Sequence, residues 1–67
     1  MISYAPLWRT MEQRGVTTYT LIHHFHFNKG TLHSLKHEKN ISTATLNDLC
    51  QMLDCRVEDV LEYIADK

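Results

Sequence analysis

The sequence predicts an all-α protein, a compact domain of five short helices over residues 1–67. Two observations favour this fold class. Apolar residues recur at helical spacing in successive short segments, and residues that commonly begin helices precede most of them. Strand signals are essentially confined to Met1–Tyr4, which alternate in character and suit an extended conformation. A chain of this length supports one small core, so a single domain is expected.

The first helix is expected at about residues 5–14. Pro6 suits the first helical turn, where its missing N–H costs nothing. Gly15 follows the segment as a natural stop. Three apolar side chains recur at helical spacing between these two residues: Leu7, Trp8 and Met11.

Two further short helices and the turn between them are expected next, at residues 18–24, 28–37 and Phe25–Phe27. Thr17 and Thr18 are N-cap candidates for the earlier helix, and Asn28 is the candidate for the later one. Their apolar sides contain Leu21, Ile22, Leu32 and Leu35. Gly30 lies inside the later helix, where glycine costs about 1 kcal/mol relative to alanine. This cost suggests that a side chain at Gly30 would obstruct something.

A polar loop at Glu38–Ile41 precedes a fourth helix, which Ser42 caps and which Asp54 and Cys55 end. Its apolar positions follow the i, i+3, i+4, i+7 template: Leu46, Leu49, Cys50 and Leu53. The same template predicts a fifth helix from Val57, Val60, Leu61 and Ile64. Acidic residues stand at the start of this last segment, where they complement a helix dipole: Glu58 and Asp59.

Charge is distributed unevenly along the chain. Residues 1–40 contain five Lys or Arg and two Asp or Glu, a net charge of +3, whereas residues 41–67 contain two and six, a net charge of −4. All five histidines fall between His23 and His37, so mild acid makes the first part more positive. Such polarity can orient a protein toward a polyanion, although the total charge of −1 predicts modest non-specific affinity.

The sequence shows neither a secretory signal nor an apolar run of the roughly 20 residues that cross a bilayer. A cytoplasmic location is therefore expected. Cys50 and Cys55 lie five residues apart, a spacing that gives a disulfide no obvious geometric support. Both cysteines are expected to be buried free thiols, which behave as small apolar residues.

The segment from Thr17 to His37 has the element lengths of a helix-turn-helix, whose second helix enters the major groove of DNA. Phe27 and Leu32 are expected to fill the angle between its helices, and Leu35 to anchor the far end. The third helix contains T-L-x-x-L, followed by I-S-x-x-T-L-x-x-L-C-x-x-L-x-C and V-E-D-V-L-E-Y. With these motifs the chain resembles, over nearly its whole length, the small Cro/C1-type helix-turn-helix regulators. These are bacterial and phage-related DNA-binding proteins of the lambda-repressor-like fold.

The resemblance implies sequence-specific binding of double-stranded DNA by a transcriptional regulator, a repressor or autoregulator, with residues 28–37 in the major groove. The residues that it places at base edges are Asn28, Lys29, Gly30, His33, Ser34 and His37. The residues that it places at the DNA backbone are Thr17, Thr18, Thr31, Lys36, Lys39 and Asn40. Asparagine, lysine and serine can each bond to base edges, and a glycine lets the helix backbone come close.

Two positions differ from the family's usual pattern. His26 stands in the turn where glycine is usual. Histidine is among the non-glycine residues enriched at positive φ, so the turn is expected to form with His26 at positive φ and with some strain. Ile22 stands where a small residue usually faces the third helix, so the packing between the two helices is expected to open.

One such unit makes few DNA contacts, so two copies on half-sites about one DNA turn apart are expected to bind better. Met1–Tyr4 or the acidic and apolar face of the fifth helix could join the copies. A second interpretation is a protein-interaction module of the same fold, such as an antitoxin-like protein that binds a partner through its acidic C-terminal half. Salt separates these interpretations, because DNA binding weakens steeply with ionic strength.

Other kinds of site find little support. Histidines and cysteines offer metal-ligating atoms, but H-H-x-H, from His23 to His26, lacks the paired spacing of a zinc site. His33 and Ser34 are neighbours on a helix and cannot easily form the nucleophile–base hydrogen bond that acyl transfer needs. No glycine-rich phosphate loop occurs. The sequence therefore predicts no catalytic residue, metal, cofactor or small-molecule effector.

Overall fold

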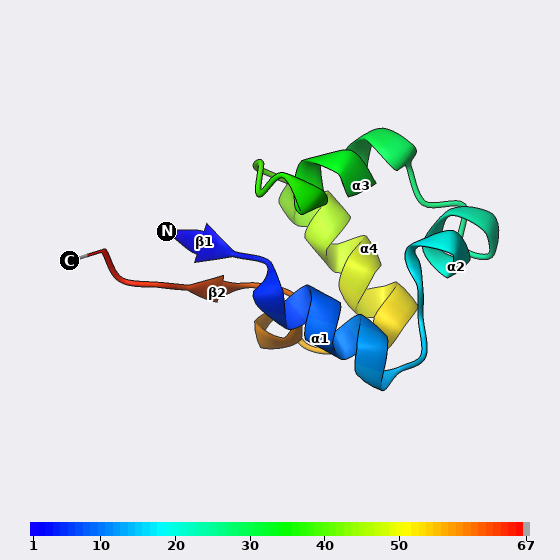
Figure 1. The fold of residues 1–67 in the computed structure, drawn as a ribbon, viewed down its shortest axis with the longest axis horizontal. Helices are drawn as coiled ribbons and strands as arrows, with labels where there is room; N and C mark the ends of the chain where they lie inside the picture. Colours follow the sequence, from blue (N-terminus) through cyan, green and yellow to red (C-terminus); the bar gives the residue numbers. More distant parts are fainter. Residues whose placement is uncertain (67) are drawn as a thin grey trace.

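The computed structural model describes residues 1–66, so Lys67 of the predicted domain lies outside the described residues. Within them the fold contains four α-helices, one short 3₁₀ helix and two strands (Figure 1). In chain order these elements are β1 (Ile2–Ser3), α1 (Ala5–Gln13), α2 (Thr18–His23), α3 (Lys29–Lys36), α4 (Thr43–Leu53), the 3₁₀ helix η1 (Val57–Asp59) and β2 (Glu62–Tyr63). The mostly helical prediction is confirmed, but the helix count of five is wrong.

Three of the four α-helices begin at the predicted capping residues. The side-chain oxygens of Thr17, Asn28 and Ser42 each accept a hydrogen bond from the backbone N–H three residues later, at 3.1 Å. Each bond satisfies one of the backbone donors that a helix leaves free at its first turn. Helix α1 instead begins with Pro6 in its first turn, as the sequence predicts.

A small apolar core joins all four α-helices and the 3₁₀ turn. Its fully buried side chains are Leu7, Leu21, Leu35, Leu49 and Val60. Figure 1 shows α4 crossing the middle of the helical body, with α1 and α3 on either side of it. Cys50 and Cys55 lie at the edge of this core as half-buried free thiols, so they are less enclosed than the sequence suggested.

The predicted fifth helix is wrong, because the chain after α4 forms only one 3₁₀ turn and then a strand. Strand β2 pairs with β1 in an antiparallel two-stranded ribbon, with Ile2 opposite Tyr63 and Ser3 opposite Glu62. The apolar template that suggested a helix does not form one buried face. Val60 is fully buried, whereas Val57 and Ile64 are 50% and 45% exposed.

The ribbon replaces the helix for two physical reasons. Valine, tyrosine and isoleucine in this segment favour strands over helices. In addition, Met1–Tyr4 offers an extended partner: Ile64 donates its N–H to the Met1 carbonyl at 2.7 Å, and the Met1 amino group donates to the Ile64 carbonyl at 2.5 Å. These hydrogen bonds join residues that are 63 positions apart in sequence, which no local pattern can reveal.

The ribbon also changes the expected shape of the molecule. It projects from the helical body (Figure 1), and the molecule extends over 40 × 23 × 18 Å. The body is compact, as predicted, and the long dimension includes the projecting ribbon. None of the helices in the described part of the chain has the length and apolar character that crossing a bilayer requires.

Candidate nucleic-acid interface

The turn between α2 and α3 places the two helices at a fixed angle. The N–H of Phe27 donates to the Leu21 carbonyl at 2.8 Å, which folds the chain back onto α2. His26 adopts φ +57°, so the positive φ predicted for this turn residue is confirmed. Phe27 packs partly buried against the core beside buried Leu32, as expected for the residues between the helices. Ile22 is also partly buried there.

Helix α3 has one buried and one exposed side. Leu32 and Leu35 point into the core. The other side carries residues predicted to approach base edges. Ser34 is half-buried there, and four others are exposed: Lys29, Gly30, His33 and His37. Residues 28–40 contain three lysines and one glutamate, so this surface carries a net positive charge. The outer side of α3 is therefore accessible to a polyanion.

Asn28 and Gly30 are coupled at the start of α3. The Asn28 Oδ1 atom is occupied by its cap bond to the Thr31 N–H, which leaves the Asn28 amide nitrogen available as a donor. A Cβ atom added at Gly30 would lie 3.0 Å from the same Oδ1 atom, tighter than most contacts of this kind. The glycine therefore leaves room for the cap, a reason for its presence that is independent of DNA.

The remaining side chains of the α3 surface are also partly ordered. Ser34 Oγ donates to the Gly30 carbonyl at 3.2 Å, so its hydroxyl keeps acceptor capacity toward a ligand. The rings of His33 and His37 lie one turn apart, with centroids 4.2 Å from each other and planes tilted by 43°. The two imidazole rings therefore lie next to each other on the exposed side of α3.

The end of α3 is fixed by a left-handed residue and by a long-range hydrogen bond. Glu38 adopts φ +55°, and the N–H of Lys39 donates to the Ser34 carbonyl at 2.8 Å, which closes the last turn. The hydroxyl of buried Tyr4 donates to the Lys39 carbonyl at 2.8 Å. These contacts hold Lys39 and Asn40, both exposed, next to the end of the helix.

The residues predicted to contact the DNA backbone fall into two groups. Thr17 and Thr18 lie at the start of α2, where the Thr17 hydroxyl is 3.0 Å from that of Thr20. The other residues lie on α3 or directly after it: Thr31, Lys36, Lys39 and Asn40. The structure thus brings both groups to the same helix pair.

Tyr19 was not among the residues predicted to contact DNA, and it is 70% exposed on α2. Its ring packs against that of His23, with a centroid separation of 4.2 Å and planes tilted by 32°. The i, i+4 spacing of an aromatic residue and a histidine on a short helix was the available signal. Tyr19 adds a large exposed ring beside Thr17 and Thr18.

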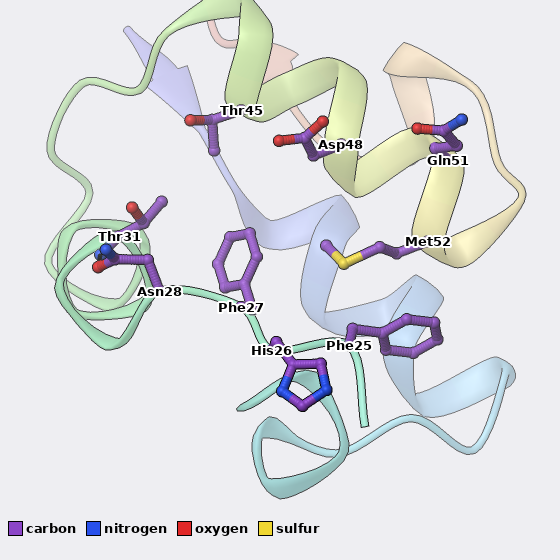
Figure 2. A pocket seen from close by; sticks show the side chains of 9 residues that line it. All are labelled: Phe25, His26, Phe27, Asn28, Thr31, Thr45, Asp48, Gln51 and Met52. Atoms are coloured by element: carbon purple, nitrogen blue, oxygen red, sulfur yellow. Dashed lines mark hydrogen bonds between the residues drawn. The ribbon is translucent and has the colours of Figure 1, made fainter. Parts of the chain in front are cut away.

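A groove of about 610 Å³ lies between the turn and α4. Figure 2 shows Phe25, Phe27 and Met52 lining it together with polar side chains of α4 such as Asp48. The sequence does not predict this groove, because the walls of the groove come from segments that meet only in the fold. Among residues 1–66, no group of three or more His, Cys, Asp or Glu side chains is placed to hold a metal ion.

A capped helix pair with a tight turn, whose second helix exposes a polar and net positive side, defines a helix-turn-helix fold of the DNA-binding class. Comparison with known families makes the assignment specific. The chain belongs to the Cro/C1-type HTH DNA-binding domain family, whose model matches residues 6–66.

The structure is also similar to the crystal structure of the transcriptional regulator VanUg, form II. The TM-score is 0.85 at 26% sequence identity, over 97% of this chain and 87% of the VanUg chain. No curated protein matches the sequence. The family and the structural neighbour confirm the expected resemblance and the lambda-repressor-like fold.

Proposed function

We propose that this protein is a transcriptional regulator that binds double-stranded DNA sequence-specifically with α3 in the major groove. The observation that carries this proposal is the division of α3 into a buried leucine side and an exposed polar side. The major groove is about 12 Å wide and admits one such helix. The similarity to a transcriptional regulator supports the same conclusion.

The exposed residues of α3 suit the two kinds of DNA contact differently. Lys29 and Ser34 offer a cation and a hydroxyl to base edges, joined by Gly30, His33 and His37 on the same side. Asn28 contributes its free amide nitrogen, because its oxygen caps the helix. Lys36, Lys39 and Asn40 follow as backbone contacts, with Thr17, Thr18 and Thr31 completing that set.

Two copies on adjacent half-sites, about one DNA turn apart, would give the affinity that one small unit lacks. Repression or autoregulation is the proposed outcome, because a protein bound at an operator blocks access of other proteins to that DNA. A cytoplasmic location is also proposed, because a regulator of this kind must reach the DNA that it binds.

Selection of bound sequences from random duplexes tests the proposal, followed by measurements on the enriched sequence. Lys29→Ala and Ser34→Ala should lower affinity for that sequence more than for random DNA, since each removes a base contact. Lys36→Ala should weaken both and lower the slope of log affinity against log salt by about 1. Arg56→Ala is the matched control, because Arg56 is an exposed cation beside Glu58 and distant from α3 in the sequence.

Two outcomes would overturn the proposal. One is a selection from random duplexes in which no sequence is enriched over background. The other is an affinity for the enriched duplex that Lys29→Ala, Ser34→Ala and Arg56→Ala reduce equally. Binding of a partner protein with weak salt dependence, and no binding of DNA, would instead favour the interaction-module alternative.

A further inference from the structure

The last turn of α3 carries two histidines at a spacing that can chelate a metal ion. His33 and His37 lie four residues apart, which is the H-x-x-x-H spacing that the run from His23 to His26 lacks. We propose that these two imidazoles together bind one transition-metal ion of the Zn²⁺ and Ni²⁺ class, and that the bound ion opposes base recognition by α3. The metal site rests on the two rings alone, and only its effect on DNA rests on the proposed function.

The backbone places both histidines on one side of the helix. His37 is the C-cap residue, and its N–H donates to the His33 carbonyl at 3.1 Å, so the turn between them is a closed helical turn. Side chains four residues apart on such a turn lie one above the other. The left-handed Glu38 and the hydrogen bond from the Lys39 N–H to the Ser34 carbonyl end the helix directly afterwards. The backbone of the site is therefore already ordered before a metal ion binds.

The distance between the rings suits a chelate. Zinc binds imidazole nitrogens at about 2.0–2.1 Å in a tetrahedral arrangement, which sets two such nitrogens about 3 Å apart. The ring centroids of His33 and His37 are 4.2 Å apart, and the ring planes are tilted by 43°. Because the nitrogens lie at the rims of the rings, a small rotation of either side chain brings one nitrogen of each ring to this separation. Both side chains are exposed, so such a rotation disturbs no core packing.

The ligand atoms determine the class of metal. Imidazole nitrogen suits Zn²⁺, Ni²⁺ and Cu²⁺, whereas Mg²⁺ and Ca²⁺ prefer oxygen ligands. Among residues 1–66 no group of three or more His, Cys, Asp or Glu side chains could hold an ion, so water completes the coordination at this pair. Lys29 and Lys36 lie on α3 within four residues of His33, and their charges lower the affinity for a dication. The site therefore suits an exchangeable ion better than a structural one.

A metal ion at this pair would occupy atoms that the proposed DNA contact uses. His33 and His37 lie on the exposed side of α3, which the proposed function places against base edges. Nitrogens bound to a metal cannot bond to bases, and the ion with its water molecules would separate the helix from the groove floor. The charge of the ion still attracts phosphates, which every sequence presents alike. The metal should therefore lower the preference for the selected duplex over random DNA.

Calorimetric titration of the full chain with Zn²⁺ or Ni²⁺, without DNA, tests the site. The wild type should bind one ion per chain at this pair. His33→Asn, His37→Asn and the variant with both changes should each weaken this binding by at least about tenfold, because a single imidazole lacks the effective concentration that the second ligand supplies. Asparagine and histidine have similar helix propensities, so α3 should persist in these variants. Mg²⁺ should not compete with Zn²⁺.

The variant His23→Asn/His24→Asn is the matched control, because it also removes two exposed histidines. It should bind Zn²⁺ like the wild type. Nuclear magnetic resonance adds a local readout: Zn²⁺ should shift the ring signals of His33 and His37 together and slow the exchange of the His37 N–H, which is bonded across the chelated turn. Equal affinities of the wild type and His33→Asn/His37→Asn, or a tenfold loss in the control variant, would overturn the inference.

The effect on DNA is measured on the duplex selected above. Saturating Zn²⁺ should lower the ratio of its affinity to that of random DNA by at least about fivefold, which corresponds to the loss of one base contact. The ratio for His33→Asn/His37→Asn should not respond to Zn²⁺. An unchanged ratio in the wild type with the ion bound at the pair would refute the effect on recognition.

The two proposals fail separately. A wild type that chelates Zn²⁺ at His33 and His37 but binds no duplex refutes the DNA-binding proposal and leaves the metal site intact. Conversely, a protein that binds its selected duplex with the predicted salt dependence, but whose Zn²⁺ affinity is unchanged in His33→Asn/His37→Asn, refutes the metal site alone.

Discussion

Replacing Gly30 by alanine separates two explanations of this glycine, room for the Asn28 cap and close approach of DNA. Alanine should stabilise α3 by about 1 kcal/mol through helix propensity. Its Cβ, however, would lie 3.0 Å from the Asn28 oxygen that caps the helix, and a lost cap costs about 1 kcal/mol. The two effects oppose each other, so Gly30→Ala alone should leave the free energy of unfolding nearly unchanged.

A double-mutant cycle with Asn28→Ala exposes the coupling. Asn28→Ala should cost about 1 kcal/mol, and with the cap removed Gly30→Ala should then add its full gain of about 1 kcal/mol. Urea unfolding gives the four free energies, and each kcal/mol corresponds to roughly 4–8 °C in Tm for a domain of this size. Equal stabilisation by Gly30→Ala in both backgrounds would show that the cap does not explain the glycine.

The same variants inform the DNA-binding proposal. If the α3 backbone approaches DNA at Gly30, Gly30→Ala should weaken binding to the selected duplex although the fold is intact. Asn28→Ser controls for the cap, because serine caps about as well as asparagine but lacks the amide nitrogen. Unchanged affinity in Gly30→Ala would confine the role of this glycine to the cap.

Three further substitutions or measurements address other parts of the structure. Leu35→Ala, at a fully buried position, should destabilise the fold by about 2–5 kcal/mol in urea unfolding, and a cost below 1 kcal/mol would contradict the core described above. Tyr4→Phe removes the hydrogen bond to the Lys39 carbonyl and should cost about 1 kcal/mol, with faster amide exchange in the loop after α3 as its local signature. Burial raises the pKa of the Cys55 thiol, and Cys50 and Asp59 add to the shift. At pH 8 a smaller fraction of Cys55 is therefore thiolate in the folded protein than in the urea-unfolded chain, so its alkylation should be slower when folded. Equal alkylation rates in the two states would contradict this.

The sequence predicted the first four helices because their signals are local. Thr17, Asn28 and Ser42 each precede an apolar stripe, and each caps its helix in the structure. The left-handed turn at His26 followed from the family resemblance, since histidine stands there in place of glycine. The left-handed residues Glu38 and Asp54 were not anticipated. Glutamate is not among the residues enriched at positive φ; aspartate is, but at Asp54 the sequence was used only to end the fourth helix.

The candidate site was predictable in outline but not in its internal bonds. The exposed side of α3 follows from the spacing of Leu32 and Leu35. The sequence does not show which polar atoms on that side remain free for a ligand, because an asparagine at position 28 suits a helix cap and a base contact equally well. Only the structure shows its oxygen bonded to the Thr31 N–H and close to the position of a Gly30 Cβ.

The C-terminal segment shows why a local pattern can mislead about a surface. Val57, Val60, Leu61 and Ile64 fit a helix, but Val60 alone of these is fully buried, and the segment's extended end pairs with residues 1–3. The sequence offered Met1–Tyr4 and the last segment as two alternative dimer surfaces, and the fold makes them one ribbon. Because β1 leads directly into Tyr4, whose hydroxyl holds the Lys39 carbonyl after α3, that ribbon is linked by one residue to the proposed DNA contacts.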